Sequence, residues 1–322
     1  MTSRTGPAAV LAGLGTALPP RVVGNDELAA RLDTSDEWIR GRTGIARRHW
    51  IEPGMSTIGL ATEAGARALK SAELGEVGAV VLATTTPDRP CPASAPEVAS
   101  RLGLPKVPAM DVGAVCAGFV YGLAIGAGLI GAGIVPDVLV IGADTFSTIV
   151  DPTDRATAVI FGDGAGAVVL RAGSPSDAGA LGPFDLGSDG ELNDLITMPP
   201  GGSFTMQGKL AFRHAVERMA GSALAVLGAA GWTPDDVDQF VGHQANRRIL
   251  VSLAERLGVP MDRVVSNIDR VGNTAAASIP LALADAAAGG RLVGGHRVLL
   301  TSFGGGLAWG STVLRWPEIR PA

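Results

Sequence analysis

Three residues with chemistry of their own follow apolar, strand-like segments of this sequence: Cys116, His243 and Asn273. Cys116 stands in DVGAVCAGFVYG, where a strand-like segment gives way to a Gly/Ala-rich helical pattern. A thiol at a helix N-terminus feels the positive end of the helix dipole, which favours the nucleophilic thiolate. His243 lies in VGHQANRR, and Asn273 lies at a helix start in RVGNTAAAS. The set predicts a nucleophile accompanied by two polar side chains.

Each of these residues also has a purely structural interpretation. A buried cysteine is often inert, an asparagine at a helix start is often a cap, and a core histidine can simply be hydrogen-bonded. The Gly-rich segment FGGGLAWG (303–310) is open in the same way. The segment is either a tight connection between two strands or a loop whose exposed backbone N–H binds an oxyanion.

The elements that must position these residues form an α/β pattern. Short runs that are apolar on both faces predict buried strands, and the stretches between them have helical periodicity. The predicted strands are Ala79–Ala83, Asp137–Ile141 and Val298–Leu300. The clearest helices are Ser56–Lys70 and Phe212–Ala230. Such alternation predicts a sheet covered by helices on both faces.

The two halves of the chain look like copies of one α/β unit. Strand-like Val107–Val112 precedes Cys116, and Val264–Ile268 precedes Asn273 in the same way. Cys116 and Asn273 are therefore expected at equivalent positions, with His243 at the end of the strand that matches Ala79–Ala83. Strand ends are where α/β sheets hold ligands, so the three side chains are expected to meet. We expect halves 1–172 and 173–322 to form one rigid body.

Composition excludes several classes of protein. The 322 residues hold 26 Lys+Arg against 31 Asp+Glu, a net charge of -5, which is a poor basis for binding nucleic acid. Two cysteines cannot build a disulfide framework or a zinc cluster, and they predict a cytoplasmic protein without a metal site. The N-terminal apolar run is the wrong length for a signal peptide. The apolar stretch Cys116–Val135 is rich in glycine and is interpreted as a buried helix rather than a membrane span.

Seven motifs together resemble the β-ketoacyl-acyl carrier protein synthase III family. They are TSDEWIRGRTGI (34–45), VCAGF around Cys116, DPTDR (151–155), IFGDGAGAVVL (160–170), GHQANRRI (242–249), GNTAAASIP (272–280) and FGGGLAWGS (303–311). The resemblance runs through nearly the whole chain and implies the thiolase fold. That fold stacks two βαβαβ-type halves in a five-layer αβαβα arrangement, and the family implies a homodimer.

The resemblance also implies roles for the site residues. Cys116 would take the acyl group from an acyl-CoA, with the backbone N–H groups of Cys116 and Gly305 as an oxyanion hole. His243 and Asn273 would donate to the malonyl thioester oxygen of malonyl-acyl carrier protein during decarboxylation. The product would be a β-ketoacyl-acyl carrier protein, and no metal or redox cofactor would be needed.

Further positions match the family's substrate contacts. The contacts to CoA and pantetheine would be Trp38, Arg42, Arg155, Gly208, Phe212 and Asn246. A basic rim for the acidic carrier protein would comprise Arg213, Arg248 and Arg256, although these arginines taken alone would be an ordinary solvated helix face. The acyl pocket would be lined by Cys91, Leu195 and Phe204.

Two departures from the family pattern bear on the starter acyl group. Cys91 stands where a bulky aromatic is usual, at a position that faces the acyl pocket of the neighbouring subunit. The segment at 197–205 is shorter than the usual capping loop. Both favour a starter other than acetyl, for polyketide or fatty-acid initiation. The alternatives are an acyltransferase that moves the acyl group from Cys116 to another acceptor, and a catalytically silent dimer partner.

Overall fold

Two sheets with helices between and outside them form the core of the protein. The computed structural model describes residues 6–104 and 106–322, so the first five residues of the N-terminal segment considered above lie outside it. The first sheet has the strand order β1-β7-β6-β4-β5. Its strands are β1 (Ala8–Ala17), β4 (Ala79–Ala83), β5 (Ala109–Val112), β6 (Asp137–Thr145) and β7 (Asp163–Gly173).

The second sheet has the order β11-β12-β13-β8 and comes from the C-terminal part of the chain. Its strands are β8 (Leu181–Ser188), β11 (Gln239–Gly242), β12 (Arg297–Gly304) and β13 (Ala308–Arg315). In both sheets a parallel pair is followed by antiparallel neighbours: β4 with β6 then β7, and β11 with β12 then β13. Strands β4 and β6 are buried on both faces, as the apolar runs predict.

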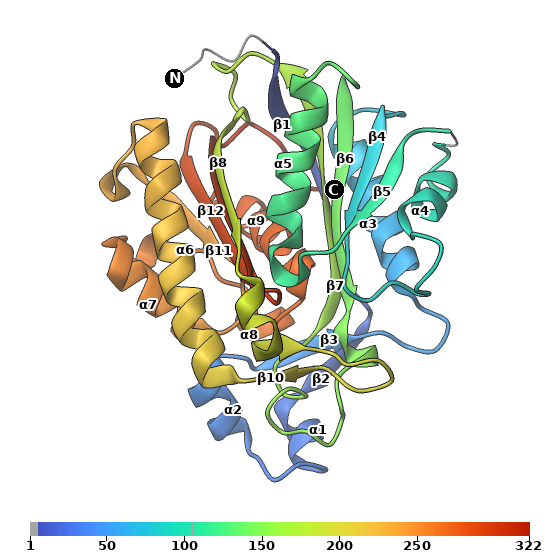
Figure 1. Cartoon of the computed structure of the whole chain (residues 1–322), viewed down its shortest axis with the longest axis vertical. Helices are drawn as coiled ribbons and strands as arrows, with labels where there is room; N and C mark the ends of the chain where they lie inside the picture. Colours follow the sequence, from blue (N-terminus) through green and yellow to red (C-terminus); the bar gives the residue numbers. More distant parts are fainter. Residues whose placement is uncertain (1–5, 105) are drawn as a thin grey trace.

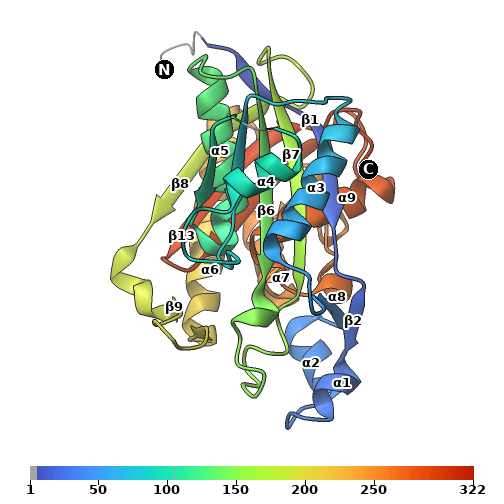
Figure 2. The same ribbon diagram turned by 90° about the vertical axis from the view of Figure 1, so that its right-hand side faces the viewer.

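Helices form three layers around the two sheets (Figure 1). The outer layers are α3 (Thr57–Ser71) with α4 (Ala95–Arg101) on the first sheet, and α6 (Gly208–Ala230) with α7 (Arg247–Leu257) on the second. Figure 2 shows α3 and α4 in front of the first sheet. Between the sheets lie α5 (Gly118–Gly131) and α9 (Ser278–Ala288), which contact strands of both. The order of layers is therefore αβαβα.

Smaller elements gather at one end of the molecule, beyond the strand ends (Figure 1). They are β2 (Arg21–Gly24), α1 (Asn25–Ala29), α2 (Asp36–Thr43), β3 (Arg47–Trp50), the hairpin of β9 (Ile196–Thr197) and β10 (Thr205–Met206), and α8 (Ile268–Val271). A 3-10 turn precedes each central helix, at Val115–Ala117 before α5 and at Ala275–Ala277 before α9.

Two details of the expected duplication are wrong. Val264–Ile268 makes only a single bridge, from Val264 to Phe240, because the chain turns at Asn267 and enters α8 at Ile268. The residues equivalent to each other at the two helix starts are Cys116 and Ala276, because the left-handed residues that open the 3-10 turns are Val115 and Ala275. Asn273 lies three residues before the counterpart of Cys116.

The apolar stretch that begins at Cys116 forms the central helix α5, which is 14 residues long and packs between the sheets. Among the described residues, no helix is both long and apolar enough to cross a membrane. The glycines of α5 permit close packing of this helix on the first sheet. A Cβ atom at Gly122 would lie 2.9 Å from Cγ1 of Val140, whereas one at Gly128 would meet nothing within 4 Å.

These two glycines predict opposite effects of one substitution. Gly122→Ala should lower the free energy of unfolding by about 1–3 kcal/mol, because the methyl group collides with a stiff β-branched side chain. Gly128→Ala should raise it by about 0.5–1 kcal/mol through helix propensity alone. Urea unfolding of both variants measures the difference, and equal effects would contradict the close packing of α5 on β6.

Candidate active site

A cavity of about 700 Å³ opens at the end of the molecule where the strands of both halves terminate. Its buried lining includes His243 and Asn273, which are 2% and 5% exposed, and the half-buried Cys116 also lines it. The structure therefore brings together the three residues that the sequence singled out. Gly305 lines the same cavity.

Cys116 is held in a strained turn at the start of α5. Val115 has φ 45°, a left-handed conformation that β-branched residues rarely adopt. Burial raises the pKa of the Cys116 thiol, and the nearby carboxylate of Asp144 raises it further. Both effects oppose the thiolate that the helix terminus is expected to favour.

His243 lies directly after β11, at the buried end of the cavity. Its Nδ1 is 2.6 Å from the hydroxyl oxygen of Ser278, at the start of α9, and its backbone N–H donates to Thr301 O. Burial lowers the pKa of the imidazole to about 3, so the ring is neutral at physiological pH. A ring held at Nδ1 presents Nε2 to the cavity.

Asn273 is fixed by its own backbone and side chain. Its N–H donates to Ile160 O and its carbonyl accepts from Gly162 N, both at 3.0 Å. The side-chain oxygen accepts from Ala275 N at 2.9 Å. The amide oxygen is thereby used within the turn, which leaves the NH₂ group as the donor toward the cavity.

Aromatic rings form a wall of the cavity on the Cys116 side. Phe161 and Phe204 line it, with their centroids 5.2 Å apart in an edge-to-face arrangement. Phe146 stacks on Phe161 from behind. Of the three residues expected in the acyl pocket, only Phe204 lines the cavity of its own chain. Leu195 packs in the core beside it, and Cys91 is exposed elsewhere on the surface.

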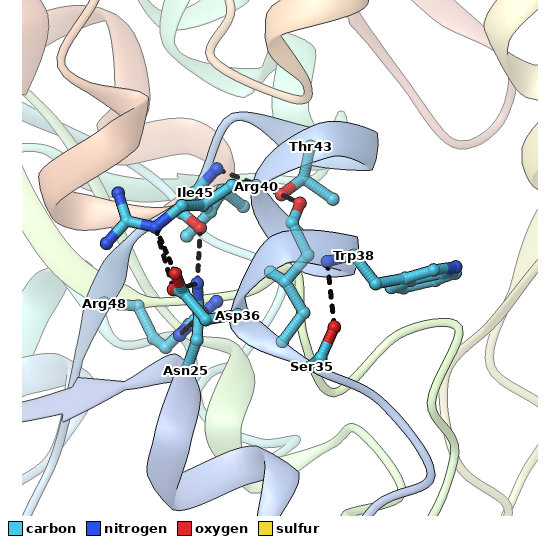
Figure 3. Close-up of polar contacts among 9 residues, drawn as sticks. Asn25, Ser35, Asp36, Trp38, Arg40, Thr43, Ile45 and Arg48 are labelled. Atoms are coloured by element: carbon cyan, nitrogen blue, oxygen red, sulfur yellow. Dashed lines mark hydrogen bonds and ion pairs between the residues drawn. The ribbon is translucent and has the colours of Figure 1, made fainter.

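The exposed end of the cavity is built by α2, which carries Trp38 and Arg42. Figure 3 shows how the sequence anchors this helix: Ser35 accepts from Trp38 N at 3.1 Å, and Asn25 donates to Asp36 and to Ile45 O. Beneath them the fully buried guanidinium of Arg48 donates to Asn25. Trp38 points away from this cluster.

Two guanidinium groups lie near the Trp38 ring. The guanidinium carbon of Arg155 is 4.9 Å from the ring centroid and that of Arg42 is 5.9 Å from it. Arg42 lines the cavity, whereas Arg155 donates to Asp33 O beside it. A flat ring flanked by cations matches the needs of an aromatic base with phosphates.

The remaining expected contacts lie on α6 and α7. Gly208 and Phe212 line the cavity, and so does Asn246, whose side chain caps α7 and donates to Arg42 O. Arg248 lines the cavity and is exposed, whereas Arg213 and Arg256 are exposed outside it. In the part of the chain that the structure describes, none of these three arginines has an ion-pair partner within 4.0 Å.

Sequence reasoning missed much of the apolar lining. Several missed residues share one face of α6 with Gly208 and Phe212, at helical spacing, so the periodicity of that helix could have found them. They are Ala211, Ala215 and Met219. Among the described residues, no group of three His, Cys, Asp or Glu side chains is arranged to hold a metal ion.

Comparisons with known proteins agree with this fold. The 3-oxoacyl-[acyl-carrier-protein] synthase III model matches residues 110–190, and the model of that family's C-terminal part matches residues 227–316. The chain is 61% identical to β-ketoacyl-[acyl-carrier-protein] synthase III 5 of Streptomyces coelicolor, over 97% of this chain and 98% of the relative. It is 52% identical to β-ketoacyl-[acyl-carrier-protein] synthase III of Pseudomonas aeruginosa, over 98% of each.

Solved structures agree as well. The crystal structure of the Pseudomonas aeruginosa PAO1 3-oxoacyl-(acyl carrier protein) synthase III superimposes with a TM-score of 0.96 at 53% identity, covering 98% of this chain and 100% of that one. The priming β-ketosynthase of the R1128 polyketide pathway superimposes with a TM-score of 0.92 at 34% identity, covering 100% and 99%. The predicted thiolase fold is confirmed, and these similarities define a thiolase-fold acyltransferase of the ketosynthase kind. The chain belongs to the 3-oxoacyl-[acyl-carrier-protein] synthase III family.

The neutral, buried His243 predicts a pH dependence of stability. The pKa is about 3 in the folded protein, below the ordinary value of 6.5, so between these values the unfolded chain binds a proton that the folded protein does not. Stability from this group is therefore complete above about pH 6.5 and falls as the pH decreases toward 3. From about pH 7 to about pH 5 the wild type should lose about 2 kcal/mol more than His243→Gln.

Urea unfolding at the two pH values measures this loss. The variant serves as its own control for the other histidines, which it retains. Equal losses in both proteins would mean that the folded protein protonates His243 as readily as the unfolded chain does.

Proposed function

We propose that the protein condenses an acyl-CoA starter with malonyl-acyl carrier protein, through an acyl thioester on Cys116, to give a β-ketoacyl-acyl carrier protein, CO₂ and CoA. The observation that supports this most is the convergence of Cys116, His243 and Asn273 on one cavity. The exposed end of that cavity carries the aromatic and basic side chains expected for a CoA thioester.

The first half-reaction is acyl transfer. The Cys116 sulfur attacks the thioester carbonyl, the C–S bond to CoA breaks, and the thiol proton passes to the departing CoA sulfur. Negative charge builds on the carbonyl oxygen during the attack. The backbone N–H groups of Cys116 and Gly305 are the proposed donors to it, since preorganised N–H groups are the usual means of holding an oxyanion.

The second half-reaction is decarboxylation followed by condensation. Loss of CO₂ from the malonyl group leaves an enolate with its charge on the thioester oxygen. Asn273 has its NH₂ group available, and a Ser278 hydroxyl that donates to Nδ1 keeps the His243 proton on Nε2. Two such donors stabilise the enolate, which then attacks the acyl carbon and releases the Cys116 thiolate. These steps need only CoA and carrier-protein thioesters, and no other cofactor.

The substrate arms are assigned from the exposed end of the cavity. Trp38, Arg42 and Arg155 are the proposed contacts of the adenine. Gly208, Phe212 and Asn246 are the proposed contacts of the pantetheine arm. Arg213, Arg248 and Arg256 carry positive charge around the opening of a protein with a net charge of -5. Local positive charge of this kind attracts an acidic carrier protein. We place the reaction in the cytoplasm.

Two experiments on single variants test the condensation. Wild type incubated with acetyl-, isobutyryl- and hexanoyl-CoA should gain one acyl mass on the peptide that contains Cys116, and Cys116→Ala should gain none.

Asn273→Ala should acylate nearly as fast as the wild type but condense about 10²–10³-fold more slowly, the usual loss for one oxyanion donor. Equal losses in both half-reactions would make Asn273 a structural cap, and an acyl adduct on Cys116→Ala would move the nucleophile elsewhere.

Starter choice is proposed to depend on Cys91 of a second subunit. In one chain this thiol is exposed, away from the cavity, so it can line an acyl pocket only across a homodimer. A small residue there widens the pocket and favours starters larger than acetyl, which suits a priming role in a polyketide or fatty-acid pathway.

Cys91→Phe tests the starter assignment. The added ring should leave kcat/KM for acetyl-CoA nearly unchanged and lower it for isobutyryl- and hexanoyl-CoA. Little stability should be lost, since overpacking costs about 1–3 kcal/mol only where the space is already filled. If the larger starters lose no more than acetyl does, Cys91 does not face the pocket. Cys91→Ser, which keeps the size, is the matched control.

A further inference from the structure

The two halves of the protein are related by a constant offset of 160 residues at the site. Ala79 pairs with Val138 as Gln239 pairs with Val298. The 3-10 turns begin at Val115 and Ala275, and both residues have left-handed backbone, with φ 45° and 48°. The offset gives the residues of these strands and helix starts a structural counterpart in the other half.

At most of these positions one half has a reactive or polar residue and the other half has alanine or glycine. Cys116 corresponds to Ala276, His243 to Ala83, and Ser278 to Gly118. The packing follows the same symmetry: Ser278 contacts His243, and a Cβ at Gly118 would lie 2.9 Å from Cβ of Ala83. Thus only the helix start at Cys116 has reactive side chains around it, and the equivalent helix start at Ala276 does not.

Asp144 reverses the direction of this difference, because here the polar residue lies beside Ala276, the counterpart of the catalytic cysteine. Asp144 lies at the end of β6, and its counterpart at the end of β12 is Gly304, beside the catalytic Cys116. A Cβ at Gly304 would lie 2.7 Å from Cys116 N, so glycine keeps the space next to that backbone nitrogen open. Next to Ala276 N, the equivalent space holds the carboxylate of Asp144, which accepts from that nitrogen at 3.0 Å.

The carboxylate of Asp144 is fully buried and is bound only by neutral donors. One oxygen accepts from Ala276 N, and the other accepts from Thr85 N at 2.7 Å and from the Thr86 hydroxyl at 3.1 Å. Across the described ranges, no Arg, Lys or His forms an ion pair with it. Burying an unpaired carboxylate is costly, so a benefit elsewhere is expected to offset the cost.

We propose that Asp144 is a positioning residue for the condensation: its carboxylate fixes the Asn273–Ala276 turn of the C-terminal half against β6 of the N-terminal half. This inference rests on the proposed function. Asp144 accepts from Ala276 N, and the side-chain oxygen of Asn273 accepts from Ala275 N, the preceding backbone nitrogen. Because Asp144 fixes this turn, it also fixes the direction of the Asn273 NH₂ group.

Burial raises the pKa of the Asp144 carboxyl to about 7, so above that pH it carries a negative charge. This charge acts on the nucleophile with the opposite sign. Burial is the main cause that raises the pKa of Cys116, and the Asp144 carboxylate adds to it. Removing the charge should therefore make the Cys116 thiol more reactive while it loosens the enolate donor. A residue that served only to stabilise the fold would not separate these two effects.

Asp144→Asn tests the proposal, with Asp137→Asn as the matched control. Asp137 lies at the other end of the same strand and likewise accepts from a backbone N–H, that of Gly78. Alkylation of Cys116 by iodoacetamide at a fixed pH above 7, followed on its peptide, should be severalfold faster in Asp144→Asn, because loss of the nearby negative charge lowers the pKa of the thiol. Acylation by acyl-CoA should not slow. Asp137→Asn should leave both rates unchanged.

Decarboxylation is measured in a Cys116→Ala background, where the thiol plays no part. Adding Asp144→Asn should slow release of CO₂ from malonyl-acyl carrier protein about ten- to a hundredfold, the cost of a misplaced donor. Unchanged decarboxylation, or equal losses in acylation and decarboxylation with unchanged alkylation, overturns the proposal. Absence of acylation in the wild type would instead refute the proposed function, and the alkylation comparison would still report on Asp144. If Asp144→Asn does not fold, Asp144→Ser takes its place with the same readouts.

Discussion

The site depends on two left-handed turns that open the central helices. At Val115 and at Ala275 the backbone takes a conformation that side chains disfavour, and each turn is held by the strand ends of the opposite half. Such strain persists only where the surroundings over-determine it. Here the surroundings are two sheets and two buried helices packed face to face. The turns place Cys116 and Asn273 from different halves beside one cavity, and neither half could do so alone.

Much of this arrangement follows from sequence. The strand Ala79–Ala83 and the helix from Phe212 to Ala230 are readable because continuous apolar runs and helical periodicity report burial directly. The identity of Cys116 and His243 as site residues followed from their place after strand-like segments. The exact pairing of equivalent residues between the two halves did not follow from sequence, because only the backbone at Val115 and Ala275 shows which residues are equivalent.

Other features depend on tertiary contacts that no local pattern contains. The segment from Val264 to Ile268 begins with two valines, as a strand would, yet Val264 makes only one bridge before the chain turns at Asn267. Burial raises the pKa of Cys116, and so does Asp144, which is distant in sequence. Cys91 and Leu195 were assigned by family position, and within one chain neither lines the cavity.

The strand order of the first sheet has a consequence for biosynthesis. Strand β7 lies between β1 and β6, and Ala8 pairs with Gly173. On the ribosome β1 leaves first and finds no partner until β7 has been made, at about 5–20 residues per second. Until then β1 is unpaired, and once β6 has been made its edge away from β4 is open as well. Unpaired strand edges are where aggregation starts. Chaperone demand should therefore be greatest before residue 173 emerges and should fall once β7 closes the gap.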